Sequence, residues 1–213
     1  MSTHARWMLP ATCVTSATVL IASACSVGTG TGEITGSLLL RDCNVDLAEY
    51  SMRPTFFAAD YITNLGAFDG EESPFATIRV QRGSYRESVS DGLIISVYDV
   101  NAIARDHLGE PMELTAVDED RERLIDITFY AGQTCDAGYP DEFWRVPGNL
   151  HAVGGTITFL ALHAPDLDGG DTEISAILDN AEFATDRPDQ RHAVLSGSFR
   201  FFYQRGAPAQ SFP

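Results

Sequence analysis

The sequence predicts an all-β fold, an antiparallel β-sandwich or jelly roll of about seven to eight strands with one short helix. Apolar and polar residues alternate with period two in one segment after another, as in strands that have one buried and one solvated face. Turns rich in Gly, Pro and Asp separate these segments, and a single segment has helical character. A barrel has the same alternation, so sandwich and barrel both remain open.

The alternation identifies the strands in chain order. Their inward rows are Ile34, Gly36, Leu38 and Leu40; Ala76, Ile78 and Val80; Leu93, Ile95 and Val97; Ile125, Ile127 and Phe129; and Leu195, Gly197, Phe199, Phe201 and Tyr203. The segment 156–163 is apolar on both faces, as in a central strand. In 172–184 the apolar positions jump from Leu178 to Ala181, which predicts a bulge at Asp179-Asn180.

The remaining segments are assigned from residues that end helices and from the absence of a hydrophobic period. Residues 100–108 predict a short helix that ends at Gly109. The regions 44–75 and 132–152 are rich in Gly, Pro, Asp and aromatic residues without a clear period, and we expect long loops there. The aromatic C-terminal strand suggests a sugar-stacking surface, but rings on the apolar face of a strand indicate core packing instead.

The start of the chain has the layout of an export signal. Arg6 precedes a mostly apolar run from Trp7 to Ile21, the small residues Ala22-Ser23-Ala24 follow, and Cys25 comes directly after them. This arrangement resembles the lipobox of bacterial lipoproteins, and the chain resembles envelope lipoproteins of that kind. The resemblance implies cleavage before Cys25 and acylation of its thiol with diacylglycerol. Ala22 departs from the family, which prefers Leu there, and plain secretory cleavage after Ala24 is the alternative.

Domain boundaries and location follow from this resemblance. We expect a signal peptide at 1–24, a flexible Gly/Thr tether at 25–32 and a single β-rich domain at 33–213. The protein is then exported and anchored by lipid at the cell envelope. The family signals retention in the inner membrane with Asp after the cysteine; Ser26 stands here, which implies the outer membrane where the host has one.

Cysteine usage predicts a disulfide. The chain has four cysteines; Cys13 leaves with the signal and Cys25 carries the lipid, so Cys43 and Cys135 remain as a pair. An exported protein matures in an oxidising compartment, where two remaining thiols are expected to form a bridge. The alternative role, a catalytic nucleophile at either position, has no local sequence signature in its favour.

The charge balance excludes some partners. The chain has 30 acidic and 14 basic residues, all of the latter Arg, and a formal charge of −16; loss of the segment 1–24, which holds Arg6 and no acid, changes it to −17. Such a charge repels phosphate backbones and anionic headgroups, so we expect no nucleic-acid partner and a membrane attachment through the lipid alone. An envelope protein or a carbohydrate is the expected partner.

One loop suggests a metal site. Asp166, Asp168 and Asp171 alternate with Leu167 and the Gly169-Gly170 pair, and carboxylates so spaced can ligate calcium. The loop lacks the full Asp-x-Asp-x-Asp-Gly spacing with a distal Glu, and Asp-Gly-Gly-Asp also suits a hairpin turn. Calcium is therefore the cofactor hypothesis and a plain turn is its alternative.

Enzyme motifs are missing from the sequence. There is no Gly-x-Ser-x-Gly, no His-Glu-x-x-His and no phosphate-binding Gly loop, and the histidines after the signal are dispersed: His107, His151, His163 and His192. A glycosidase needs only two carboxylates placed by the fold. The function expected from the sequence is a non-enzymatic binding or scaffolding module, and the alternative is a carbohydrate-binding or glycoside-hydrolysing β-sandwich assisted by calcium.

Overall fold

The chain folds into one antiparallel sheet of ten strands, which confirms the all-β prediction. The computed structural model describes residues 30–62, 74–83, 90–116, 124–135, 149–165, 167 and 172–203. The strands are β1 (Gly30–Leu40), β2 (Val45–Met52), β3 (Phe56–Ile62), β4 (Phe75–Gly83), β5 (Ser90–Val97), β6 (Met112–Glu113), β7 (Ile125–Ala131), β8 (Leu150–Ala161), β9 (Glu173–Ala184) and β10 (Arg191–Phe202). Their order is β2-β1-β10-β9-β8-β7-β5-β4-β3, and β6 pairs with β8.

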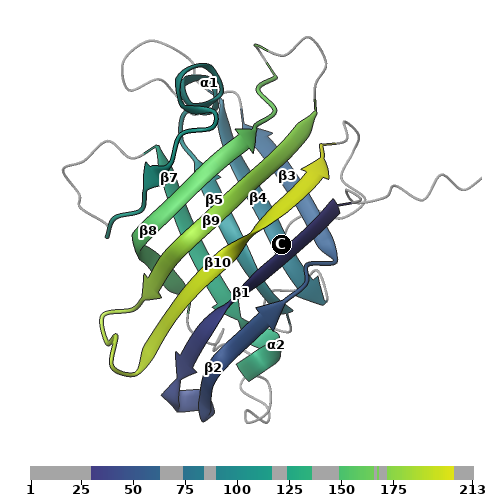
Figure 1. Cartoon of the computed structure of the whole chain (residues 1–213). Coiled ribbons are helices and arrows are strands. Elements are labelled where there is room, and N and C mark those ends of the chain that lie inside the picture. Colours follow the sequence, from purple (N-terminus) through teal and green to yellow (C-terminus); the bar gives the residue numbers. More distant parts are fainter. Residues whose placement is uncertain are drawn as a thin grey trace, which may run out of the picture.

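The sheet folds over into two facing layers, as in a sandwich (Figure 1). β2, β1, β10, β9 and β8 form one layer, and β7, β5, β4 and β3 form the other. Rings from the two layers meet in the interior: Tyr50 lies 5.8 Å from Phe129, and Phe57 lies 5.5 Å from Phe201, between ring centroids. The apolar rows expected from the sequence form this core, since most of their residues, among them Ile78 and Leu93, are buried.

Local kinks allow the sheet to bend. The register of β9 against β10 shifts between Leu195 and Gly197, opposite the predicted bulge, and Asn180 adopts a left-handed conformation with φ 46°. Gly155, on the neighbouring β8, has φ 81°. A Cβ atom at Gly155 would overlap the backbone oxygen of Asn180, so only glycine fits there. The bulge predicted at Asp179-Asn180 is confirmed, and it bends the layer that carries β8, β9 and β10.

The predicted loops 44–75 and 132–152 are partly wrong. β2 and β3 lie in the first region, and α2 (Gly132–Cys135) and the start of β8 lie in the second. β2 is at the edge of the sheet, so its residues Asp46 to Glu49 are exposed on both faces and show no alternation. β3 contains Ala58-Ala59-Asp60, residue types with weak strand preference. The two-residue β6 also has no sequence signal.

The first strand begins earlier than predicted, and the predicted short helix is present. β1 begins at Gly30, because Gly30, Thr31 and Gly32 pair with the end of β10; the strand therefore takes in the last three residues of the predicted tether. The predicted helix is present as α1 (Val100–Ala102), capped by the Asp99 side chain and continued by a π-helical turn, η3 (Ile103–His107). Among the residues described, no helix is long and apolar enough to span a bilayer.

Candidate functional site

A buried carboxylate is the most unusual polar group of the core. Asp91 lies in β5 and continues the inward row of Leu93, Ile95 and Val97, and its side chain has no exposed surface. Arg82 continues the inward row of β4 in the same way and is the direct cross-strand partner of Asp91. Both side chains therefore point into the space between the layers, where β4 finishes and β5 starts, and they meet Tyr50 and Ser51 of β2.

Four donor groups surround the Asp91 carboxylate. Its Oδ2 accepts from Arg82 Nη2 at 2.5 Å, from Thr134 Oγ1 at 2.6 Å and from Tyr50 Oη at 3.3 Å. Its Oδ1 accepts from the backbone N–H of Thr134 at 2.9 Å. We call Asp91, Arg82, Tyr50 and Thr134 the Asp91 network. A buried carboxylate is tolerated only when its charge is paired and its oxygens accept hydrogen bonds, and this network meets both conditions.

Tyr50 remains a neutral donor in this network. Burial raises the pKa of the Tyr50 hydroxyl well above its ordinary value of 10.0, and the negative charge of Asp91 raises it further, more than Arg82 lowers it. Ionised Tyr50 would face Asp91 as a second buried negative charge. Proton release from this tyrosine is therefore strongly disfavoured.

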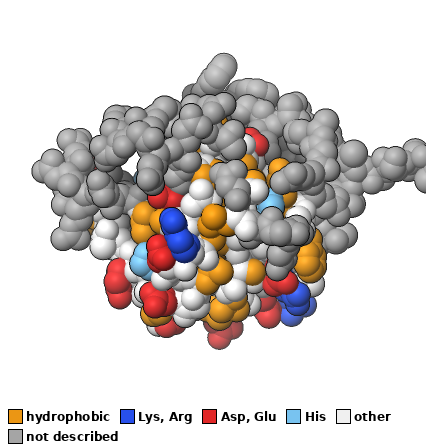
Figure 2. All heavy atoms as spheres, turned by 90° about the horizontal axis from the view of Figure 1, so that it is seen from above, with side chains coloured by type: hydrophobic (Ala, Val, Ile, Leu, Met, Phe, Trp, Pro, Cys, Tyr) orange, Lys and Arg blue, Asp and Glu red, His pale blue; other side chains and the backbone are white. Residues whose placement is uncertain are grey.

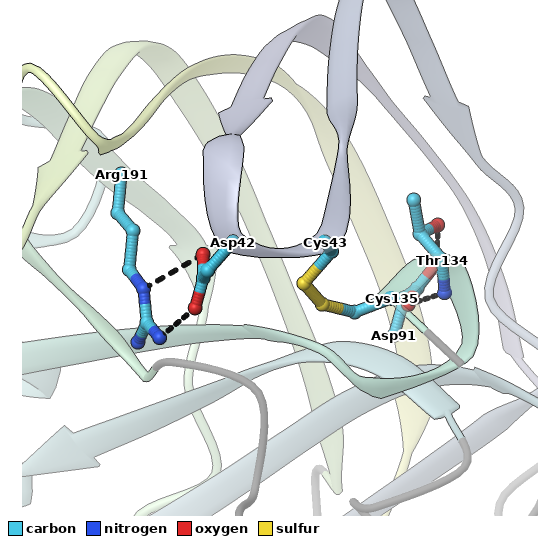
Figure 3. Close-up of a disulfide and its surroundings, with 6 residues drawn as sticks. All are labelled: Asp42, Cys43, Asp91, Thr134, Cys135 and Arg191. Carbon is cyan, nitrogen blue, oxygen red and sulfur yellow. Dashed lines mark hydrogen bonds and ion pairs between the residues drawn. A yellow bond between two sulfur atoms is a disulfide. The ribbon is translucent and has the colours of Figure 1, made fainter. Parts of the chain in front are cut away.

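The predicted disulfide lies beside the Asp91 network and is confirmed (Figure 3). Cys43 is in the 3-10 turn η1 (Arg41–Cys43) that joins β1 to β2, and Cys135 ends α2, one residue after Thr134. Their Cα atoms are 5.3 Å apart. On the other side of Cys43, Asp42 forms an ion pair with Arg191. The bridge thus ties the β1–β2 turn of one layer to α2, which binds Asp91 of the other.

Arg82 links the same elements by hydrogen bonds. Besides Asp91, it donates from Nη1 to the backbone oxygen of Ser51 in β2 at 3.0 Å and from Nε to Gln133 Oε1 in α2 at 3.1 Å. One guanidinium therefore holds β2, β5 and α2 together in a fixed fork geometry. The arrangement of the Asp91 network and the disulfide joins the two layers at this end of the fold.

The chemistry of this cluster is structural. A general acid or base needs a titrating group with access to a substrate atom. Both Asp91 oxygens instead accept from protein donors, and Tyr50 has a pKa far above neutrality. Asp91 is also the one acidic side chain among the buried polar residues of the described part of the chain. The cluster offers no carboxylate pair of the kind that glycoside hydrolysis uses.

A second cluster closes the opposite end of the fold. His163, which follows β8, stacks on Tyr203 with ring centroids 4.9 Å apart. Tyr61, near the end of β3, meets both rings edge-on at 5.3 and 5.0 Å. His163 is 2% exposed, so this aromatic cluster fills the interior between the layers. His163 is thus a packed histidine, in line with the absence of ligand spacing in the sequence.

The other predicted site residues have different outcomes. Cys25 and the calcium candidates Asp166, Asp168 and Asp171 lie outside the described residues. Within the described ranges no group of three His, Cys, Asp or Glu side chains is placed to hold a metal ion. The core interpretation of the C-terminal strand is confirmed, because Phe199 and Phe201 are buried.

Sequence reasoning missed the Asp91 network, although a signal for it exists. Arg82 and Asp91 each occupy the next inward position of a period-two apolar row, where a charged residue predicts a buried ion pair. No sequence pattern pointed to Thr134, because it lies in the region 132–152, which was expected to be a loop. Comparison with known proteins adds no assignment: no protein-family model, no curated protein and no solved structure matches this chain.

Proposed function

We propose that this protein is a lipid-anchored component of the bacterial envelope, exported with residues 1–24 as signal and acylated at Cys25. The observation that carries the proposal is the position of Cys25, directly after Ala22-Ser23-Ala24 and five residues before β1 begins at Gly30. The Cys43–Cys135 disulfide supports export, since such bonds persist in oxidising compartments.

The folded domain acts in this proposal as a non-enzymatic binding or scaffolding module. The Asp91 network, a group of buried polar side chains that the structure places together, joins the two layers of the sheet. Among the side chains exposed on the described surface are several large apolar ones, which suit contact with another surface better than catalysis.

Metabolic labelling tests the anchor. The full chain is expressed in a bacterial host with an alkyne analogue of palmitate, and the label on the mature protein is measured together with the mass of its N-terminal peptide. Wild type should carry diacylglycerol on Cys25, and Cys25→Ala should lose the label and remain as uncleaved precursor or soluble protein. Cys13→Ala is the matched control and should label like wild type. An unlabelled wild-type protein would refute the anchor.

A binding role is tested on the lipidated protein in envelope extracts. Capture of the wild type should recover a partner in fixed ratio, and a mock extract from cells without the protein gives the background. Conversely, turnover of envelope glycans by the purified protein, abolished by substitution of a carboxylate, would show that the domain is an enzyme.

A further inference from the structure

The exposed large apolar side chains gather at one end of the fold. We call this the tether end: β1 starts there, and β3, β5, β8 and β10 finish there. Eight large apolar side chains are exposed in the described part of the chain, and Leu47, at the start of β2, is the one at the opposite end. The other seven lie at or near the tether end: Ile62, Tyr98, Leu108, Leu160, Leu167, Ile177 and Phe202.

Three of these side chains lie on adjacent strands of one layer, and Arg200 lies between Phe202 and the row of Ile177 in the register of β9 against β10. Leu160 of β8, Ile177 of β9 and Phe202 of β10 all point to the outer face of the sheet and are 55%, 40% and 44% exposed. Leu108 adds to them, because the next residue, Gly109, donates its N–H to Phe159 of β8 at 2.8 Å. We call Leu108, Leu160, Ile177 and Phe202 the tether-end patch. Figure 2 looks down on this end and shows hydrophobic side chains exposed among polar ones.

One pair of opposite charges lies close to the patch. Arg200 forms an ion pair with Glu173 at 2.7 Å, and its guanidinium lies 5.5 Å from the ring centroid of Phe202. An arginine beside an exposed ring is suited to an interface, where the stem lies on apolar surface and the head stays in water. His107 and Glu110 face each other at 3.5 Å near Leu108. His107 is charged only when protonated, and Asp179, two residues after Ile177, is exposed, so the surroundings of the patch keep part of the negative charge of the chain.

The proposed anchor enters the fold beside this patch. Gly30 is paired with Phe201, so the chain from Cys25 reaches the sheet next to Phe202. Gly30 is five positions after Cys25, and even a fully extended chain of this length spans about 17 Å. A lipid on Cys25 would therefore hold the tether end close to the bilayer, with too little chain for the domain to stand away from it.

We infer that the tether-end patch lies on the membrane surface, where Leu160, Ile177 and Phe202 contact the boundary between headgroups and acyl chains. This inference rests on the proposed anchor and adds to it a defined orientation, with the disulfide and the Asp91 network pointing away from the lipid. The tether-end patch suits a bilayer with zwitterionic headgroups, because the strongly negative domain would be repelled by anionic headgroups.

Tryptophan quenching by lipid tests this orientation. Phe202→Trp and Leu160→Trp are each made in full-length Trp144→Phe protein, so that the mature chain has a single indole. The matched control is Leu47→Trp, a comparably exposed apolar position at the opposite end. The lipidated proteins are reconstituted in phosphatidylcholine vesicles with plain or brominated acyl chains. Circular dichroism and melting verify that each variant folds like wild type.

The expected result is a loss of emission confined to the tether end. Interfacial apolar faces reach about 5–10 Å into the headgroup and acyl boundary, so brominated chains should reduce the emission of Phe202→Trp and Leu160→Trp by about twofold and leave Leu47→Trp unchanged. With Cys25 shown by mass to carry diacylglycerol, equal quenching at both ends, or none at either, overturns the orientation and leaves the anchor intact. A mature protein without the lipid overturns both.

Discussion

The two ends of this fold are closed by different chemistry. At the disulfide end, a buried carboxylate, a guanidinium and a covalent bridge tie β2, β5 and α2 together. At the tether end, the interior is filled by the rings of Tyr61, His163 and Tyr203, and the adjoining outer surface exposes large apolar side chains among polar ones. One end is held by specific bonds and the other by packing.

The difference follows from what each end has to hold. β2 is an edge strand whose residues Asp46 to Glu49 are exposed, so it gains little from burial. The Asp91 network and the disulfide supply the attachment that packing does not. At the tether end, β9 and β10 are interior strands paired on both sides. Their pairing supports the end, and several of its outer residues are apolar.

Removal of the disulfide should have the largest effect on stability. Cys43 and Cys135 are 92 residues apart in sequence, and a bridge across a loop of this length contributes about 4–5 kcal/mol in the chain-entropy model. The double variant Cys43→Ser/Cys135→Ser should lose about this free energy of unfolding in urea titrations. Hydrogen exchange should rise most in β2 and α2.

The tether end provides the internal control for that experiment. Amides of β9 from Ser175 to Ile177 and of β10 from Ser198 to Arg200, where both strands are paired on two sides, should keep the slowest exchange in the variant, relative to its lower global stability. An equal rise in hydrogen exchange at both ends would contradict the view that specific bonds hold the disulfide end and packing holds the tether end.

Neutralising the buried carboxylate should have the next largest effect. Asp91→Asn leaves the half-buried Arg82 without its counter-charge and presents an NH2 group to donors, which should cost about 3 kcal/mol. Asp42→Asn is the matched control at the same end, because its ion pair with Arg191 is about one third exposed and pairs near the surface contribute about 0–1 kcal/mol. Equal losses in the two variants would show that burial of Asp91 is not what makes it important.

The sequence contains most of the fold but only part of the site. Strands with one buried face can be predicted from the sequence, because their apolar and polar residues alternate with burial. The core rows from Ile34 to Phe201 could therefore be assigned. β2 could not, because an edge strand exposed on both faces has no period to detect. The disulfide followed from cysteine counting and compartment, an argument that needs no geometry. Tyr50 and Thr134 are 41 and 43 residues from Asp91 in sequence, and only the folded sheet brings them to the pair that Arg82 forms with Asp91.

The smallest expected effect concerns Tyr50 and appears only at alkaline pH. Because the folded-state pKa of Tyr50 is raised above the ordinary value of 10.0, its contribution to stability is complete below pH 10 and is lost as the pH rises further. Above pH 10 this one group should lower the free energy of unfolding by about 1.4 kcal/mol per pH unit. Tyr50→Phe should cost about 1 kcal/mol near neutrality, for the hydrogen bond to Asp91, and should show a shallower alkaline slope by that amount. Urea titrations of both proteins across this range measure the difference, in which the other tyrosines cancel. Parallel slopes would mean that Tyr50 is ionised as easily in the folded as in the unfolded chain, and that the disulfide end is more open to water than its bonds indicate.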